Sequence, residues 1–352
     1  MKQLTRRSYV RRLALGGLLV AAVVAISPGI GNQASSVGVV EAWRSFARRG
    51  ERPAPPIAYQ IGFRLRMPRT LLALEAGITL ALCGAVFQTL FRNALATPYT
   101  LGIASGGSLG ALLAIRWDLA VAFLGVSAVT WSAFIGSLAV IAIVFLFTRG
   151  TRRLTTNELL LAGVTLGMFC SAMMMLVTSL SSVRQTFEII RWMMGSLDTI
   201  GNLQWTSNLP LLVPAWIVLV AMARPLNQYV LGEDLAATRG VNVLRLQLIC
   251  ILFASLATAA IVAICGPIGF VGLVVPHVTA LLFGRDCRIL LPMSALLGGV
   301  FLAVCDWISQ AAMSWAGALT GQSLGVVVLP IGVVTAVVGV PIFLVLLHRR
   351  AV

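Results

Sequence analysis

Few side chains in this sequence have the types and spacings that carry out chemistry. The 352 residues include two histidines, His277 and His348, and neither lies at metal-ligand spacing from a carboxylate. The only lysine is Lys2, so the chain cannot form the Gly-Lys-[Ser/Thr] turn of a nucleotide-binding P-loop. Six cysteines are scattered without a Cys-x-x-Cys pair, which is typical of small core residues. We therefore expect no catalytic residue, no metal site and no cofactor in this chain.

Two acidic residues, Glu75 and Asp306, lie within long apolar runs. Acids at such positions are candidates for functional groups, although a buried ion pair or an interfacial position remains an open interpretation. His277 follows Pro276 at a break in an apolar run, where a histidine more often makes a helix-end hydrogen bond than binds a ligand.

The elements that position these residues are predicted to be membrane helices. The chain is 59% hydrophobic and only 11% charged, with a mean hydropathy of +0.96, whereas a soluble domain needs more polar surface. Apolar runs of about 20 residues, the length that crosses a bilayer core, recur along the sequence. The period-two pattern of a membrane barrel is absent, so helices must satisfy the backbone in lipid. We expect an all-α polytopic membrane protein with one transmembrane domain over 1–352.

Ten apolar runs predict about ten transmembrane helices. The first extends from Leu13 to Gly31 and is interpreted as a retained span, with a signal peptide cleaved near Ala34 as the alternative. The other runs cover roughly 70–91, 99–116, 119–147, 157–181, 204–223, 246–265, 268–283, 289–309 and 327–347.

The distribution of basic residues predicts the orientation. The net charge is +15, and the arginines gather at the ends of the predicted spans, which argues against nucleic acid as the partner. Cytoplasmic termini, with 1–12 inside, place 16 of the 26 basic residues in the cytoplasm. Seven of the other ten lie between Arg44 and Arg69, within a basic extracytoplasmic segment at 32–69. That segment is expected to contact lipid headgroups or an acidic partner, and composition does not separate the two.

The polar segment at 224–245 predicts a short folded helix between two spans. Glu233 and Asp234 favour a helix N-terminus, Gly240 favours a left-handed stop, and Asn242 can cap the next helix. A folded helix in such a connection suggests a surface that another protein grips. An apolar run follows it and ends at two further breaks, which involve Gly266, Pro267, Pro276 and His277.

Small residues recur every four positions in the run at 157–181. Gly163, Gly167 and Ser171 would form one smooth helix face, which suits close helix packing or, alternatively, the lining of a passage. The nearby Met168 is flexible and polarizable, so it suits a core gap or a pathway for bulky cargo.

Several motifs in order resemble the permease subunits of ABC importers for iron–siderophore complexes, haem and cobalamin (FecCD-like, type II importers). The resemblance covers nearly the whole chain from Arg64 onward. Its markers are Arg66-Met67-Pro68-Arg69-Thr70, Gly84-Ala85-Val86-Phe87-Gln88, Leu101-Gly102-Ile103-Ala104-Ser105-Gly106, Leu231-Gly232-Glu233, Gly240-Val241, the string from Gly266 to His277, and Pro330-Ile331-Gly332.

This resemblance implies a type II importer permease fold with ten helices, paired as a homodimer in the bacterial cytoplasmic membrane. Two ABC ATPase subunits that bind ATP would dock inside, and a substrate-binding protein would dock outside. It assigns ATPase coupling to 224–245, binding-protein docking to two arginines, and the pathway and gate to the run at 157–181. The residues are Leu231, Gly232, Glu233, Asp234, Leu235, Gly240 and Val241 for coupling; Arg66 and Arg69 for docking; and Thr155, Thr156, Asn157, Gly163, Gly167, Met168 and Ser171 for the pathway and gate.

The expected function is therefore uptake of a ferric chelate, with a siderophore favoured over haem or cobalamin. An ion-gradient-driven secondary transporter with Glu75 or Asp306 as a relay is the alternative. A polytopic membrane enzyme is a third hypothesis, but it lacks a cluster of catalytic groups.

Overall fold

The computed structural model describes residues 6–31, 37–48, 56–119, 122–123, 126–148, 156–198, 203–320 and 328–351, and these are almost entirely helical. The helices before the central bundle are α1 (Arg6–Ile26), α2 (Val39–Ala47) and α3 (Ile57–Tyr59). The others are α4 (Met67–Leu90), α5 (Ile103–Arg116), α6 (Ala128–Thr148), α7 (Thr156–Ser179), α8 (Val183–Met193), α9 (Leu203–Ala221), α10 (Ala223–Tyr229), α11 (Glu233–Thr238), α12 (Val243–Cys265), α13 (Val271–Phe283), α14 (Cys287–Thr320) and α15 (Ile331–Ala351).

The described helices agree with a multi-pass membrane protein. Six are long and apolar enough to cross a bilayer, and the bent pair α9–α10 makes a seventh candidate. Three shorter apolar helices, within α5, α13 and α15, fall where the sequence predicts three further spans. The all-α prediction is therefore confirmed, and a count of ten holds as an approximation.

Two predicted boundaries are wrong. The run at 119–147 begins with a pair of two-residue strands, β1 (Ala122–Phe123) and β2 (Val126–Ser127), so α6 starts only at Ala128. Hydropathy alone does not distinguish an extended apolar segment from a helical one. The span predicted at 70–91 begins earlier, because 57–90 is continuously helical despite its arginines. Its stretch from Gln60 to Arg66 is a π-helix, and the N–H of Met67 donates to the carbonyl of Gly62, five residues back.

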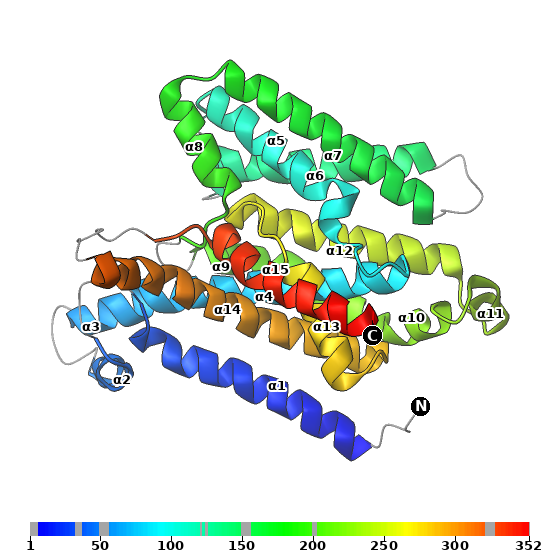
Figure 1. The fold of residues 1–352 in the computed structure, drawn as a ribbon, viewed down its shortest axis with the longest axis horizontal. Helices are drawn as coiled ribbons and strands as arrows, with labels where there is room; N and C mark the ends of the chain where they lie inside the picture. The colour runs from blue at the N-terminus through cyan, green and yellow to red at the C-terminus, as the bar shows by residue number, and fades with distance from the viewer. Residues whose placement is uncertain are drawn as a thin grey trace.

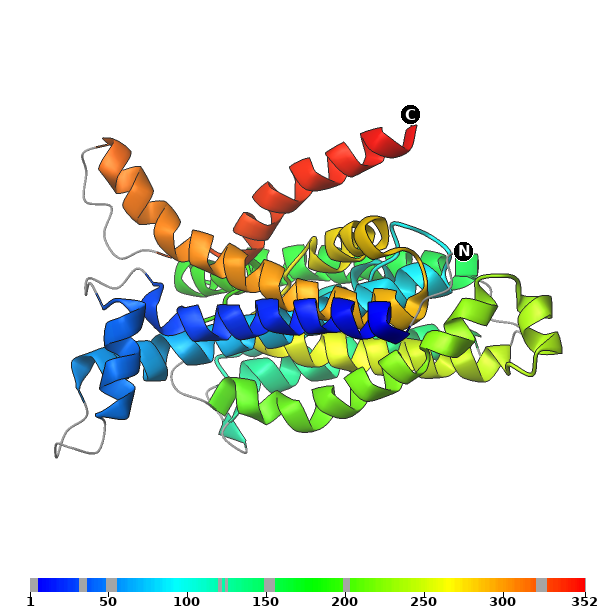
Figure 2. The same ribbon diagram turned by 90° about the horizontal axis from the view of Figure 1, so that it is seen from below.

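Helix α4 lies at the centre of the fold and packs against α14, α12, α13 and α9. Its contact with α14 is close because Gly77 faces the backbone of Gly298, where any Cβ would collide. A second group, α5 to α8, lies beside this one in Figure 1, with α6 and α7 packed against α5. Figure 2 shows α15 and the end of α14 diverging from the rest of the bundle.

The two ends of the molecule carry different elements. Figure 1 shows both termini at the end where α11 lies, which agrees with an even number of crossings. We call this the α11 end. The opposite end carries α2, α3 and α8 (Figure 1).

Candidate coupling, docking and pathway sites

The predicted short helix at the α11 end is present, and its local chemistry matches the sequence signals. Glu233 and Asp234 form the first turn of α11, and Gly232 precedes them at φ 136°. Gly240 then adopts φ 83°, a left-handed conformation that glycine reaches at little cost. The side chain of Asn242 accepts a hydrogen bond of 2.9 Å from the N–H of Arg245 and so caps α12.

Tyr229 anchors this segment to the membrane helices. Its buried hydroxyl donates to Glu233 Oε1 at 3.0 Å and accepts from Gln247 Nε2 at 3.1 Å, which joins α11 to α12. Arg92, just beyond α4, donates to the Tyr229 carbonyl at 2.7 Å and lies 4.9 Å from the ring centroid. The sequence did not predict the contact between Tyr229 and Arg92, because it spans 137 positions.

A second polar cluster fixes the start of α14 beside α10. Asn227 donates to Asp286 Oδ1 at 2.7 Å and accepts from the N–H of Cys287 at 2.9 Å. The hydrogen bonds that Asp286 accepts from Arg288, together with that from Asn227, lower the pKa of its carboxyl to about 2. This cluster holds α10, and therefore the base of α11, at a fixed position.

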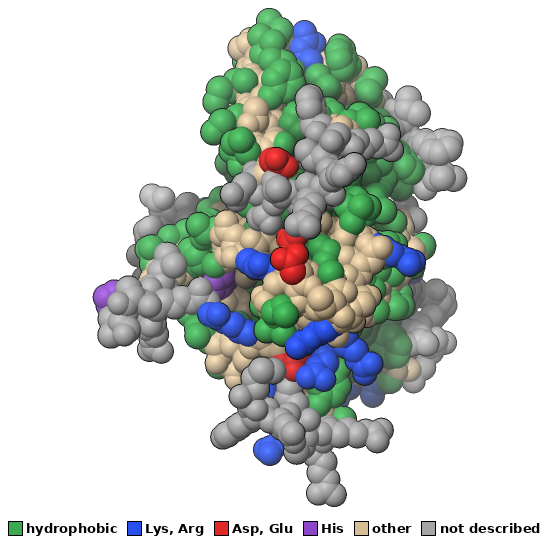
Figure 3. All heavy atoms as spheres, turned by 90° about the vertical axis from the view of Figure 1, so that its right-hand side faces the viewer, with side chains coloured by type: hydrophobic (Ala, Val, Ile, Leu, Met, Phe, Trp, Pro, Cys, Tyr) green, Lys and Arg blue, Asp and Glu red, His purple; other side chains and the backbone are tan. Residues whose placement is uncertain are grey.

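The polar segment at 224–245, which we call the α11 segment, has a partly apolar outward surface. Leu231 is 58% exposed and Leu235 is 53% exposed, while Ala236 between them and α12 is buried. Figure 3, which views the α11 end, shows basic side chains gathered on this face. Exposed leucines on an anchored helix at an arginine-rich end are suited to burial in a groove of another protein.

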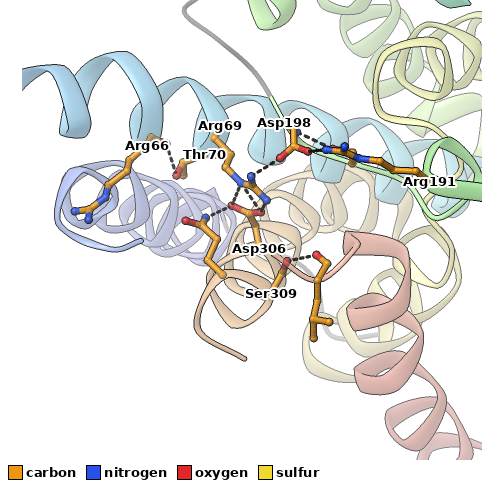
Figure 4. A network of polar contacts seen from close by, with 10 residues as sticks. Arg66, Arg69, Thr70, Arg191, Asp198, Asp306 and Ser309 are labelled. Carbon is orange, nitrogen blue, oxygen red and sulfur yellow. Dashed lines mark hydrogen bonds and ion pairs between the residues drawn. The ribbon is translucent and has the colours of Figure 1, made fainter. Parts of the chain in front are cut away.

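At the opposite end, Arg69 joins three elements of the fold. Its Nε and Nη2 contact Asp306 of α14 at 2.9 and 2.8 Å, and its Nη1 contacts Asp198 at 2.7 Å (Figure 4). Gln310 donates to the second oxygen of Asp306 at 2.7 Å, so the buried acid is fully paired.

Asp198 lies after α8, near the surface, and Arg191 of α8 approaches it at 3.4 Å. Burial opposes ionisation of Asp198, but a side-chain hydrogen bond with Ser196, the charge and hydrogen bond of Arg69 and the charge of Arg191 outweigh this effect and lower its pKa. Helix α8 was not predicted, although Ser182 and Gln185 form the capping box that announces a helix start.

Docking to an outside protein requires an exposed side chain, and Arg66 is buried. It is only 5% exposed, and it donates to the carbonyls of Pro28, Val37 and Gly31 at 3.1 to 3.3 Å. Figure 4 shows the guanidinium groups of Arg66 and Arg69 pointing away from each other. Arg66 therefore ties the end of α1 to α4, which corrects the expectation that it faces an outside partner.

The predicted pathway residues lie together on α7. A shallow hollow of about 470 Å³ is lined by Gly163, Gly167, Met168 and Ser171, together with Tyr99 and Thr100. Gly163 also packs closely on the backbone of Leu101, and Met168 is 70% exposed. The face thus combines close packing with an open surface. Thr155 lies outside the described residues, and Thr156 and Asn157 lie in the first turn of α7, where side chains are not described.

The predicted breaks fall between α12 and α13 and within α13. Gly266, at φ 68°, ends α12, and Pro267 follows it. Tyr99 holds the connection, because its hydroxyl donates to the Ile268 carbonyl at 2.6 Å and accepts from the Ile268 N–H at 2.7 Å. Pro276 lies within α13, and His277 contacts the Leu273 carbonyl at 3.0 Å through Nδ1. The part of the chain that the structure describes contains no cluster of three or more potential metal ligands.

A mostly helical bundle with several apolar spans and an anchored, protruding helix at one end has the architecture of a multi-pass membrane protein. The comparisons agree: the chain matches the FecCD transport family over residues 18–349. It belongs to that family.

Two relatives and one solved structure illustrate the similarity. The chain is 34% identical to the hemin transport system permease HmuU of Yersinia pestis, with 96% of each chain covered. It is 37% identical to the cobalamin import system permease BtuC of Halobacterium salinarum, over 85% of this chain and 76% of the relative. An inward-facing structure of a metal-chelate type ABC transporter superimposes with a TM-score of 0.80 and 29% identity, covering 97% of this chain and 99% of that one. These relatives are transport permeases rather than enzymes.

Proposed function

We propose that this chain is the membrane permease of an ABC importer that takes up a ferric chelate, with a siderophore complex as the favoured cargo. The observation that carries the proposal is the α11 segment, which exposes Leu231 and Leu235 yet is fixed to α4 and α12 through Tyr229. The relatives named for hemin and cobalamin support a bulky, metal-containing cargo.

In this proposal two separate ATPase subunits bind ATP and hold the α11 segment in the cytoplasm, so this chain needs no cofactor. Leu231, Leu235 and Val241 supply apolar contacts, and Gly232, Glu233, Asp234 and Gly240 maintain the fold of the segment. Both termini are then cytoplasmic, because they lie at the same end as α11 (Figure 1). The +15 net charge supports this orientation through the arginines gathered at that end.

At the outer end we propose that Arg69, Asp198 and Arg191 form the docking surface for a substrate-binding protein. The exposed Asp198 and Arg191 are accessible beside a pocket of about 610 Å³. Two copies of the chain would pair so that their α7 helices border a central pathway, with 155–157 as its cytoplasmic gate. The open hollow on α7 supports this arrangement because monomeric packing leaves it uncovered.

The test for coupling is a pull-down of the ATPase subunits by the purified permease. The double variant Leu231→Ala/Leu235→Ala should lose at least tenfold in apparent affinity, because it removes two exposed apolar anchors. Leu180→Ala is the control, since Leu180 is similarly exposed but lies just after α7, at the end of the molecule opposite α11 (Figure 1). Equal affinity of the double variant and the control would contradict the proposed coupling surface.

The second candidate is a secondary transporter driven by an ion gradient. Glu75 favours it, because within the described residues its buried carboxylate oxygens have no hydrogen-bond partner. Asp306 does not, since Arg69 and Gln310 already pair it. Uptake into proteoliposomes without ATPase subunits, abolished by Glu75→Gln, would establish this alternative and exclude the ABC mechanism. Growth rescue on siderophores, haem and cobalamin would identify the cargo.

A further inference from the structure

Helix α2 is an amphipathic helix that exposes an apolar and a polar stripe. Ala42 and Ser45 are buried against the rest of the fold. Val40, Trp43 and Ala47 form an exposed apolar stripe at helical spacing, and Val40 is 62% exposed. The adjacent exposed stripe is polar and consists of Glu41, Arg44 and Arg48.

The orientation of α2 places these stripes at the end of a membrane span. Figure 1 shows α2 end-on while α1 runs across the view, so the two helices are nearly perpendicular. Trp43 Nε1 donates to the carbonyl of Ala25, in the last turn of α1, at 2.9 Å. The side chains of Leu15, Leu18 and Ile26 on α1 are exposed and apolar, as a lipid-facing helix requires. The apolar stripe of α2 therefore continues the lipid-facing surface of α1 at its boundary with water.

An aromatic cluster holds α2 in this orientation. Phe63 lies 5.1 Å from the Trp43 ring, 4.8 Å from Phe46 and 5.5 Å from Tyr59, measured between ring centroids. The cluster joins α2 to the helical run that leads into α4. Tryptophan and tyrosine are the residues that favour the headgroup level of a bilayer. The geometry is thus fixed before any lipid binds.

The charge on this surface indicates the kind of lipid. Arg44 and Arg48 of this helix are exposed, and so is Arg64 in the helical run before α4, whereas Glu41 is the single acid of α2. An interfacial helix with arginines beside its apolar stripe binds anionic headgroups most strongly. We propose that α2 lies in the membrane interface, with Val40 toward the acyl chains, Trp43 at the headgroup level, and Arg44 and Arg48 on the phosphates of anionic phospholipids.

The proposal is tested on the permease alone in lipid nanodiscs, independently of transport. The variant Val40→Cys would carry a bimane fluorophore, and labelling is selective because the six native cysteines are buried. Quenching by brominated phosphatidylglycerol should exceed quenching by brominated phosphatidylcholine. Adding Arg44→Gln/Arg48→Gln should reduce that ratio at least about fivefold, since one arginine near an anionic surface contributes roughly that factor.

Two matched controls make the result decisive. A bimane at Ala237→Cys on α11 should be quenched by aqueous iodide and by neither lipid, because that exposed position projects from the bundle. Arg239→Gln, an exposed arginine at the same end, should leave the Val40 ratio unchanged. Iodide quenching at Val40→Cys without lipid quenching would overturn the proposal in favour of a protein-facing surface. Equal quenching by both lipids, unchanged by Arg44→Gln/Arg48→Gln, would overturn the anionic headgroup site.

Discussion

At each end of this permease, one side chain joins several helices. Tyr229 joins α11 to α12 and to the end of α4, and Arg69 joins α4 to α14 and to the loop after α8. Tyr229 is buried and Arg69 largely so, their polar groups are paired, and networks of this kind specify one arrangement of the elements around them. Residue-scale changes at either position should therefore alter the geometry of a whole end.

Asp286 makes the stability of the folded permease depend on pH. Its pKa in the folded protein, about 2, lies below the value of about 3.9 expected for an unfolded chain. Its contribution to stability is therefore complete above about pH 4 and is lost as the pH falls toward 2. Thermal unfolding in detergent should show wild type more stable than Asp286→Asn at pH 7, with the difference shrinking below pH 4.

The control for this experiment is Asp118→Asn, which changes an exposed carboxylate at the opposite end. Its difference from wild type should be small across the same pH range. A difference for Asp286→Asn that stays constant down to pH 2 would contradict the role assigned to the carboxylate charge.

At the scale of elements, the close approach of α4 and α14 organises the bundle. Gly77→Leu would place a large side chain against the backbone of Gly298, so the helices must separate. We expect a loss of at least about 1–3 kcal/mol of stability, the usual cost of overpacking a core. Denaturation in detergent measures it, and Gly17→Leu on α1 is the matched control because nothing lies near that position. Similar unfolding midpoints for both variants would show that the contact is looser than the structure indicates.

The same contacts explain what the sequence could predict. The α11 segment was predictable because its signals are local: Glu233, Gly240 and Asn242 act within a few residues of their own positions. The surroundings of Arg69 were not predictable, because Asp306 is 237 positions away and no local pattern records the pairing. Arg66 and Arg69 are three residues apart in one motif, yet Arg66 is directed toward Pro28 and Val37 by the packing of α1 and α2. Local turn and cap signals predict where α11 begins and ends, whereas tertiary packing decides what each side chain contacts.

At the scale of the whole molecule, the exposed face of α7 predicts how two copies meet. Met168→Cys should cross-link into a dimer with a bis-maleimide in proteoliposomes, because the proposed pairing directs both Met168 positions toward a shared pathway. Cross-linked dimer on a denaturing gel is the readout, and buried native cysteines keep the background low. Leu18→Cys on α1, equally exposed but at the margin of the fold (Figure 1), should yield little dimer. Equal yields from the two variants would contradict the proposed arrangement.

Helix α4 extends without a break from one end of the molecule to the other. Arg69 stands in its first turn and Arg92 just past its last, about 35 Å apart at 1.5 Å per residue. A stiff rod of this kind cannot tilt at one end without moving the other. If an outer ligand at the proposed docking surface strengthens the proposed attachment of the ATPase subunits, ATPase attachment must strengthen binding of that ligand by the same factor, because free-energy linkage is reciprocal. Titrating the outer ligand in the presence and absence of the ATPase subunits would therefore measure the proposed coupling at α11 from the opposite end of the molecule.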